Sequence, residues 1–271
     1  KNRMANLESL SKQVEKLAEK PSYEDERIWK LERDKTGNGY AVIRFLPAPL
    51  NEDVPWVRIW THGFKGPGGW YIENSLTTLG KDDPVSKANT ALWNSGIDSD
   101  KNIARERRRK LNYYSNIYIV EDAANPENVG KVFLFRYGKK IFEKITGVMN
   151  PEFADETPLN PFDLWEGANF KMKMRQIDGF PNYDKSEFTD KCPLDGDEKK
   201  LEEVWKQQYS LTDVTDEKNF KNYAELEARF NTVIAHEGKE LASTIEESSE
   251  GESNEKTDDT LDYFKKLAEQ E

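Results

Sequence analysis

The sequence of 271 residues contains one cysteine, Cys192, and two histidines. A single cysteine cannot form a disulfide within the chain, and its presence fits a reducing compartment. So few histidines and cysteines leave little from which to build a Ser/His/Asp or Cys/His catalytic arrangement. No phosphate-binding Gly-Lys-Ser/Thr loop occurs either. We therefore predict that the chain is not an enzyme.

Long apolar runs are also missing from the sequence. No stretch approaches the roughly 20 residues that a membrane-spanning helix needs, so we expect no membrane partner. Charged residues make up 34% of the chain. This composition predicts a modest hydrophobic core that is accompanied by at least one solvated tail.

An excess of positive charge is the third absence, because the net charge is -11. The distribution of charge matters more than the total when phosphates are bound. Residues 243–271 hold ten acidic residues and three lysines, whereas residues 101–144 hold eleven Lys or Arg and five Asp or Glu. A basic middle and an acidic end point to a nucleic-acid-binding core with an interaction tail.

Three regions are expected along the chain. Residues 1–20 carry apolar side chains at steps of three and four, which predicts an amphipathic helix that ends at Pro21. This arm docks either on its own core or on a neighbouring protomer. Residues 21–242 form the core, and residues 243–271 form a largely disordered acidic tail.

The pattern between residues 29 and 188 is typical of strands and turns. Residues 37–39, Gly-Asn-Gly, predict a hairpin between 29–33 and 40–46. Further strands are expected at 57–64 and 70–73, on either side of the turn Gly66-Pro67-Gly68-Gly69. Others are expected at 113–120, 129–137 and 170–177, and in the last of these apolar and basic residues alternate. Helices are expected at 197–208 and 217–235. The fold class is therefore α+β and mainly β, and short strands with long excursions favour an antiparallel OB-type barrel. Propensity alone does not separate such a barrel from a sandwich.

Three clusters combine basic and aromatic side chains. Lys and Arg neutralise phosphates, and rings give bases a surface on which to stack. Each cluster alone is also compatible with core packing or a solvated charge run, but three in one domain favour single-strand binding without sequence preference. The clusters comprise Arg107, Arg108, Arg109 and Lys110 followed by Tyr113 and Tyr114; Phe135, Arg136 and Lys139; and Lys171 with Phe180 and Tyr183.

Colinear blocks of the sequence resemble the single-stranded DNA-binding (helix-destabilising) protein family of T-even bacteriophages. The blocks are GNGYAVIRFLP at 37–47, HGFK at 62–65, WYIE at 70–73, PENVGKVF at 126–133, GKKI at 138–141, WEGANF at 165–170 and GFPNYD at 179–184. The resemblance covers roughly residues 1–235, and the acidic tail resembles the family only in character.

The resemblance implies an OB barrel with an inserted subdomain at about 61–110. It implies a DNA cleft that contains Trp70, Arg136, Phe180 and Tyr183, with Trp93 in place of a cleft tyrosine. It further implies that the N-terminal basic arm, here reduced to Lys1 and Arg3, binds neighbouring protomers along DNA. The tail would recruit replication proteins such as a polymerase, a helicase loader or a recombinase. The expected location is the cytoplasm of the infected bacterial host.

One departure from the family concerns its zinc ion, which one histidine and three cysteines hold. His62 is retained here, but the cysteine positions fall at Ser75, Asp83 and Ser86. A Cys3His site needs three thiolates, so we predict no zinc or other cofactor and expect His62 to be a hydrogen-bonded remnant.

Three other functions compete with this prediction. A nuclease would need converging carboxylates, whereas adjacent pairs such as Asp82-Asp83 point in opposite directions on a strand. An RNA-binding OB-fold protein would use the same stacking groove. A replication scaffold would act through its acidic tail alone. Competition between oligo-dT and oligo-U separates the second function from DNA binding.

Overall fold

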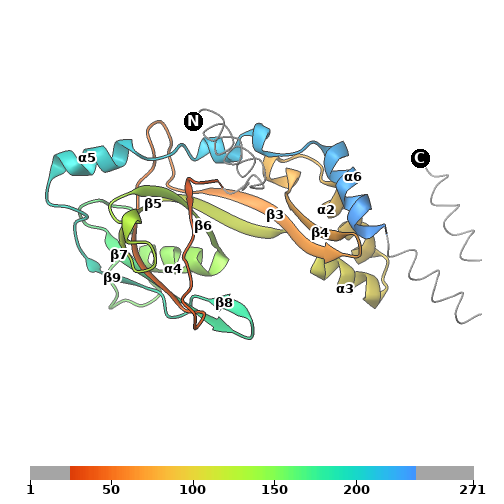
Figure 1. Cartoon of the computed structure of the whole chain (residues 1–271), viewed down its shortest axis with the longest axis horizontal. Helices are drawn as coiled ribbons and strands as arrows, with labels where there is room; N and C mark the ends of the chain where they lie inside the picture. The colour runs from red at the N-terminus through yellow and green to blue at the C-terminus, as the bar shows by residue number, and fades with distance from the viewer. Residues whose placement is uncertain (1–24, 236–271) are drawn as a thin grey trace, which may run out of the picture. The chain divides into compact units, whose positions relative to one another are not determined.

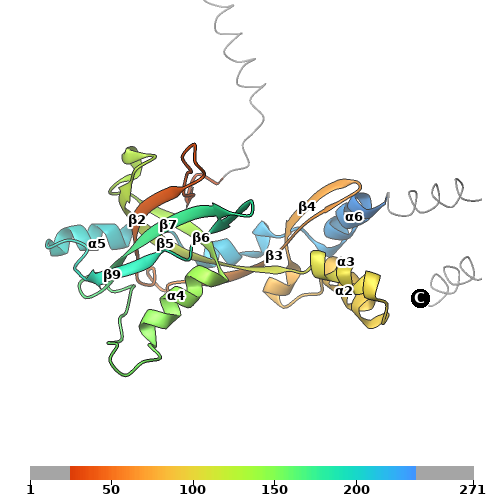
Figure 2. The same cartoon turned by 90° about the horizontal axis from the view of Figure 1, so that it is seen from below.

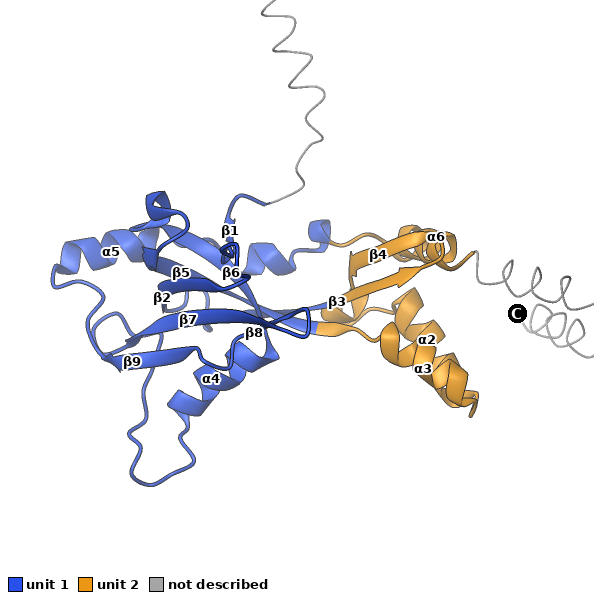
Figure 3. Ribbon diagram, turned by 60° about the horizontal axis from the view of Figure 1, so that its bottom comes forward, with its two compact units in different colours: residues 1–60, 111–219 blue, residues 61–110, 220–271 orange. Residues whose placement is uncertain are grey.

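The computed structural model describes residues 25–235 (Figure 1). These residues belong to two compact units (Figure 3). Unit 1 contains residues 25–60 and Leu111–Asn219, and unit 2 contains Thr61–Lys110 and residues 220–235. The predictions for the arm, with Lys1 and Arg3, and for the acidic tail fall outside the described residues.

Unit 1 is built around an antiparallel sheet with one parallel pair. The strands pair in the order β1-β6-β5-β2-β7-β8, and β9 also pairs with β7. Among the described residues the sheet does not close into a ring, so the structure shows the predicted α+β class with an open sheet. The strands are β1 (Ile28–Trp29), β2 (Gly39–Phe45), β5 (Lys110–Asp122), β6 (Val132–Gly138), β7 (Ala168–Ile177), β8 (Phe180–Asn182) and β9 (Glu187–Lys191).

The predicted hairpin between 29–33 and 40–46 is wrong. The turn exists, with Gly37 at φ 85°, but β1 pairs in parallel with β6. Trp29 decides this pairing, because its ring packs on Phe135 and its indole nitrogen donates to Asp122 at 2.9 Å. Burying a large ring with its polar atom satisfied outweighs the local preference for a hairpin.

Aromatic side chains dominate the core of unit 1. Phe45 has no exposed surface, and the rings of Tyr137, Phe162 and Phe170 lie around it at centroid distances of 5.6–5.9 Å. Helix α4 (Lys139–Met149) follows β6 and buries Ile141 and Ile145 in the same core. Figure 2 shows α4 along one face of the sheet. The predicted alternation in β7 is confirmed, since its apolar residues at 170, 172 and 174 are buried.

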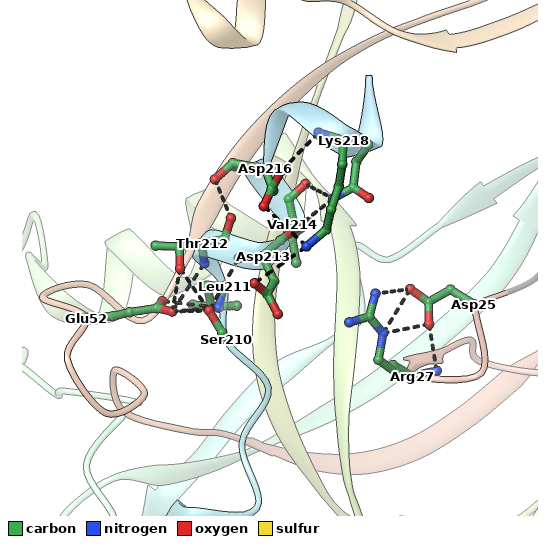
Figure 4. Close-up of polar contacts among 12 residues, drawn as sticks. Asp25, Arg27, Glu52, Ser210, Leu211, Thr212, Asp213, Val214, Asp216 and Lys218 are labelled. Atoms are coloured by element: carbon green, nitrogen blue, oxygen red, sulfur yellow. Dashed lines mark hydrogen bonds and ion pairs between the residues drawn. The ribbon is translucent and has the colours of Figure 1, made fainter. Parts of the chain in front are cut away.

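The segment after the sheet is tied back to unit 1 by polar contacts. Helix α5 (Glu198–Lys206) places Leu201 in a second apolar cluster, and the turns η3 (Thr212–Thr215) and η4 (Glu217–Asn219) follow. The Glu52 carboxylate accepts from the Leu211 amide at 2.9 Å and from the Ser210 hydroxyl at 2.8 Å (Figure 4). One side chain in the β2–β3 connection therefore fixes the start of η3.

Arg44 is a charged side chain that is fully buried in unit 1. Its guanidinium donates to the Asn169 side chain at 3.0 Å and to the carbonyls of Asp163 at 2.9 Å and Cys192 at 2.6 Å. Burial lowers the pKa of Arg44 from its usual value, and these acceptors compensate for the missing hydration. Arg44 thereby joins β2 to β7, to the segment before β7 and to the residue that follows β9.

Unit 2 has its own core. The hairpin of β3 (Val57–Gly66, which begins in unit 1) and β4 (Gly69–Asn74) confirms the prediction. The other elements are η1 (Leu76–Leu79), α2 (Pro84–Asn94), α3 (Asp98–Glu106) and α6 (Tyr223–Ile234), and the 3-10 turn η2 (Pro126–Asn128) lies in unit 1. Leu226, Phe230 and Val233 of α6 pack on Phe64 and Tyr71.

Two sequence features set the ends of α6. Asn222 and Glu225 form a capping box, so the helix begins later than the predicted 217. Its last turn approaches the β3–β4 turn, where the Gly68 amide donates to the Val233 carbonyl at 2.8 Å. A Cβ at Gly68 would lie 2.1 Å from the Thr232 carbonyl oxygen, so only glycine fits. Within residues 25–235, no helix has the length and apolar character that crossing a membrane requires.

Gly167→Ala tests the packing around Arg44. The new Cβ would lie 2.1 Å from the Asp163 carbonyl oxygen and 2.5 Å from Arg44 Nη1. We expect a loss of about 1–3 kcal/mol in the free energy of unfolding, measured by urea denaturation. The control is Gly147→Ala in α4, where the new Cβ would have no atom within 4 Å apart from its chain neighbours and the backbone of its own helix. That helical substitution is expected to be neutral or stabilising by up to about 1 kcal/mol, and equal losses in both variants would contradict the argument.

Candidate nucleic-acid interface

The basic run 107–110 connects helix α3 to strand β5. Arg107 caps the C-terminal end of α3, and Lys110 is the first residue of β5. Arg108, Arg109 and Lys110 are exposed, whereas Arg107 is only 8% exposed. The structure therefore places three of the four predicted cations at the surface.

Arg107 is anchored in the core of unit 2. Its guanidinium lies over the Phe64 ring at 5.6 Å and over the Phe230 ring at 5.7 Å from the centroids. Cation–π contacts of this kind are strengthened when they are shielded from water. Arg107 is therefore better placed to hold the backbone of the basic run than to contact a phosphate.

The rings predicted after the basic run are buried in unit 1. Tyr113 is 6% exposed and stacks on Phe142 with centroids 3.9 Å apart, and Tyr114 and Phe135 are similarly covered. Burial raises the pKa of Tyr114, and the charge of Arg136, its partner in the β5–β6 register, opposes that rise. Rings buried to this degree offer little face to a base, so they form the wall that supports exposed residues such as Arg136.

Other predicted rings are exposed. In unit 2, Trp70 on β4 is 58% exposed and Trp93 on α2 is 50% exposed. The Arg105 guanidinium lies over the Trp93 ring, 5.3 Å from its centroid. In unit 1, Phe180 at the β7–β8 turn is 75% exposed. These rings present faces on which a base can stack.

The basic residues of unit 1 lie near the loop that carries Tyr183. Arg136 and Lys139 are exposed at the junction of β6 and α4. Lys140 pairs with the Asp184 carboxylate at 3.5 Å, and Lys144 Nζ donates to the Asp184 carbonyl at 3.0 Å. Together these contacts bring the start of α4 to residues 183–184.

Two further predicted residues of unit 1 are partly covered. Tyr183 packs against the main core. Its burial raises the pKa of its hydroxyl, and the positive charge of Arg33 opposes this rise. Lys171 is half-buried on β7 and lies on the same side as Glu187. The hydrogen bond from Lys173 lowers the pKa of Glu187, and the charge of Lys171 contributes in the same direction.

Sequence reasoning missed Arg33 and Arg105 as members of these groups. The sequence places Arg33 in a hairpin strand that does not form, and it shows Arg105 only as part of a charge run. Only a short turn separates Trp93, near the end of α2, from the start of α3. Two helices joined in this way could have indicated that Arg105 on α3 packs on the Trp93 ring. The predicted site residues divide between the two units, and the prediction that they line one groove stays a prediction.

His62 lies at the centre of a buried polar cluster in unit 2. Its Nδ1 is 2.9 Å from the Arg107 carbonyl oxygen, and its Nε2 is 3.1 Å from Asp83 Oδ1. Ser75 Oγ donates to Asp83 Oδ2 at 2.9 Å, and Ser86 Oγ is 3.3 Å from His62 Nε2. The side chains of His62 and Asp83 are 1% and 0% exposed. Every position that the resemblance assigns to zinc is thus part of one hydrogen-bond network.

This donor set does not fit the family's zinc ion. Both nitrogens of His62 are engaged by protein atoms, and two of the three cysteine positions carry hydroxyls, which are poor zinc ligands beside thiolates and imidazoles. Within residues 25–235, no group of three or more His, Cys, Asp and Glu side chains is arranged to hold a metal.

Burial alone raises the pKa of the Asp83 carboxyl. The hydrogen bond and charge of His62, the Ser86 amide and the Ser75 hydroxyl together outweigh burial and lower this pKa to about 2. Asp83 is therefore ionised throughout the neutral range and forms a buried pair with His62.

Known proteins match this chain over most of its length. A sequence model of the family described as "gp32 DNA binding protein like" matches residues 37–234. The chain belongs to this family. The single-stranded DNA-binding protein of Enterobacteria phage T2 is 39% identical over 231 residues, which are 83% of this chain and 76% of that protein. The protein of the same name from Enterobacteria phage T4 is 39% identical over 216 residues, 79% of this chain and 72% of that protein.

Membership of the gp32-like family confirms the resemblance seen in the sequence. The matched range contains most of both units and every predicted DNA-contacting residue from Trp70 to Tyr183, but neither Lys1 nor Arg3. The relatives are named for binding and not for catalysis, in agreement with the expectation that the chain is not an enzyme.

Asp83→Ala tests the buried pair. Removing the carboxylate takes away the buried charge that faces His62 Nε2, and we expect a loss of about 3–5 kcal/mol in the free energy of unfolding at pH 7. The pKa of Asp83 is lowered in the folded state, so its contribution is present above about pH 4 and disappears as the pH falls towards 2. The wild-type and variant curves should therefore converge on acidification in a pH series of urea denaturation. Asp82→Ala removes the exposed neighbouring acid, so the stability of this variant should follow the wild-type curve at every pH.

Proposed function

We propose that the chain binds single-stranded DNA without sequence preference and coats it. The observation that carries this proposal is the exposed basic run Arg108–Lys110, which follows a buried anchor at Arg107 in a chain of a DNA-binding family. A cation at a fixed place on the surface is a suitable partner for a phosphate. A protein that binds unpaired strands and not the duplex shifts the equilibrium of the duplex towards melting by mass action.

The electrostatic contribution comes from both units. Arg108, Arg109 and Lys110 supply it in unit 2, and Arg136, Lys139 and Lys171 supply it in unit 1. Each phosphate that is neutralised releases condensed counterions, so binding should weaken as salt rises. This contribution is independent of base sequence, which supports binding without sequence preference.

Stacking supplies the second contribution. Trp70, Trp93 and Phe180 are at least half exposed, so their ring faces are accessible to a base. Every base has a flat face, so rings accept any sequence. Tyr113, Tyr114 and Tyr183 are partly or wholly buried in unit 1, so they would support the exposed residues of that unit.

The wider role is also proposed. The sheet of unit 1 would belong to an OB-type fold, and Thr61–Lys110 would be the subdomain inserted into it. The chain would protect single strands in phage replication, recombination and repair, in the cytoplasm of the infected bacterial host. Lys1 and Arg3 would contact neighbouring protomers, and the acidic tail 243–271 would recruit replication proteins such as a polymerase, a helicase loader or a recombinase.

We further propose that this function needs no zinc. The hydrogen-bond network of His62 and Asp83 occupies the place that the family gives to the ion. Purified protein should contain far less than stoichiometric zinc by elemental analysis. Prolonged treatment with a chelator should leave its thermal unfolding and its DNA affinity unchanged, and a stoichiometric zinc content would refute the proposal.

The basic run is tested by Arg108→Ala and Lys110→Ala. Affinity for oligo-dT, followed by tryptophan quenching, should fall at low salt in each variant. The slope of log K against log salt should become shallower by about 0.7 for each phosphate that is no longer neutralised. Lys206→Ala is the control, because Lys206 is an exposed lysine on α5 outside the predicted site. Oligo-U that competes as well as oligo-dT would favour an RNA-binding protein instead.

The rings are tested by a matched pair of tryptophans. Trp70 and Trp165 are 58% and 55% exposed, but only Trp70 belongs to the predicted site. Trp70→Ala should weaken oligo-dT binding by about 1–3 kcal/mol, the range for one stacked base, with little change in salt slope. Trp165→Ala should bind like the wild type. Equal effects in the two variants would remove the assignment of Trp70 to the interface.

A further inference from the structure

The junction between α3 and the basic run is held by a residue that makes almost no contact with solvent. We propose that His62 is a positioning residue for DNA binding: it fixes the Arg107 carbonyl and so sets the direction in which Arg108, Arg109 and Lys110 leave unit 2. This inference rests on the proposed function and adds to it a specific link between the buried cluster and the phosphate contacts.

The first step is the orientation of one peptide group. A carbonyl oxygen only accepts hydrogen bonds, so His62 Nδ1 carries the proton and donates to the Arg107 carbonyl at 2.9 Å. The peptide group that joins Arg107 to Arg108 is planar. Its other end, the Arg108 amide, donates to the Arg105 carbonyl at 3.4 Å. Both ends of this plane are thus held just before the exposed cations.

The second step is the orientation of the imidazole itself. Asp83 Oδ1 lies 3.1 Å from Nε2, opposite the nitrogen that binds the carbonyl. The carboxylate is in turn fixed by the Ser86 amide at 2.9 Å, the Ser75 hydroxyl at 2.9 Å and the Leu76 amide at 3.2 Å. An imidazole ring that is held at both nitrogens cannot rotate away from the Arg107 carbonyl.

The third step is the anchoring of the Arg107 side chain. Its guanidinium lies over the rings of Phe64 and Phe230, so residue 107 is held by its backbone and by its side chain. The three exposed cations therefore directly follow a residue that is held in place. Cations that are ordered before binding lose less conformational freedom when they meet a phosphate.

Two substitutions of His62 separate positioning from simple stabilisation. An asparagine amide nitrogen falls at about the place of Nδ1 and can still donate to the Arg107 carbonyl. A glutamine amide reaches about the place of Nε2 and keeps the contact with Asp83, but it leaves the carbonyl without a donor. Both variants lose part of the buried cluster, so both should lose stability.

The measurement is oligo-dT affinity as a function of salt, at a temperature where circular dichroism shows each variant to be folded. His62→Gln should bind about three- to tenfold more weakly at low salt, as expected when one long side chain must be ordered on binding. Its salt slope should be shallower by about 0.7 for each phosphate that is no longer neutralised. His62→Asn should keep the wild-type slope. Leu226→Ala, in the same core but outside the cluster, controls for reduced stability.

Three results would overturn the inference: wild-type binding by His62→Gln, equal weakening of both variants at an unchanged slope, or a shallower slope in Leu226→Ala. If His62→Gln does not fold, Asp83→Asn takes its place, since it weakens the hold on the imidazole while the histidine remains. A smaller reduction in affinity with a shallower slope is expected there, and a wild-type slope would overturn the inference. Absence of salt-dependent binding by the wild-type chain would instead refute the proposed function.

Discussion

A charge that is removed from water must be met by partners inside the protein, and this constraint organises both units. In unit 1 the guanidinium of Arg44 is met by two side chains and two carbonyls from segments far apart in the sequence. In unit 2 the carboxylate of Asp83 is met by an imidazole, a serine hydroxyl and two amides. Each buried charge holds together several segments, including ones that no helix or strand hydrogen bonds connect. Through His62, the Asp83 cluster also holds the Arg107 carbonyl, which directly precedes the exposed residues Arg108–Lys110.

The sequence predicted the strands well where both faces of a segment carry a clear pattern. The alternation in β7 and the glycine turn between β3 and β4 are local properties, and both appear as expected. The predicted pairing of 29–33 was wrong because a distant contact selects the partner strand. Trp29 is buried on Phe135 and its indole nitrogen donates to Asp122. The start of α6 was missed by several residues because the capping box at Asn222 overrides the helical spacing that precedes it.

The predicted interface divides by exposure, which composition alone does not reveal. A tyrosine next to an arginine run has the same pattern whether it faces solvent or the core, and Tyr113 and Tyr114 face the core. Arg107 is part of the same run as Arg108, yet aromatic neighbours from β3 and α6 draw it inward. Only Trp70, Trp93 and Phe180 remain as exposed rings among those predicted. Residues whose role depends on segments more than a hundred positions away could be placed only with the fold in hand.

The composition of unit 2 also bears on how the chain is made. Its core combines the hairpin and helices within Thr61–Lys110 with a helix that ends at Ile234, so more than a hundred residues of unit 1 lie between its two parts. During synthesis from the N-terminus, Phe64 and Tyr71 emerge from the ribosome long before Leu226 and Phe230 exist to cover them. Unit 1 has all of its described residues by Asn219 and can fold first. The anchor for Arg107 therefore forms only after Phe230 has been synthesised, later in translation than the last described residue of unit 1.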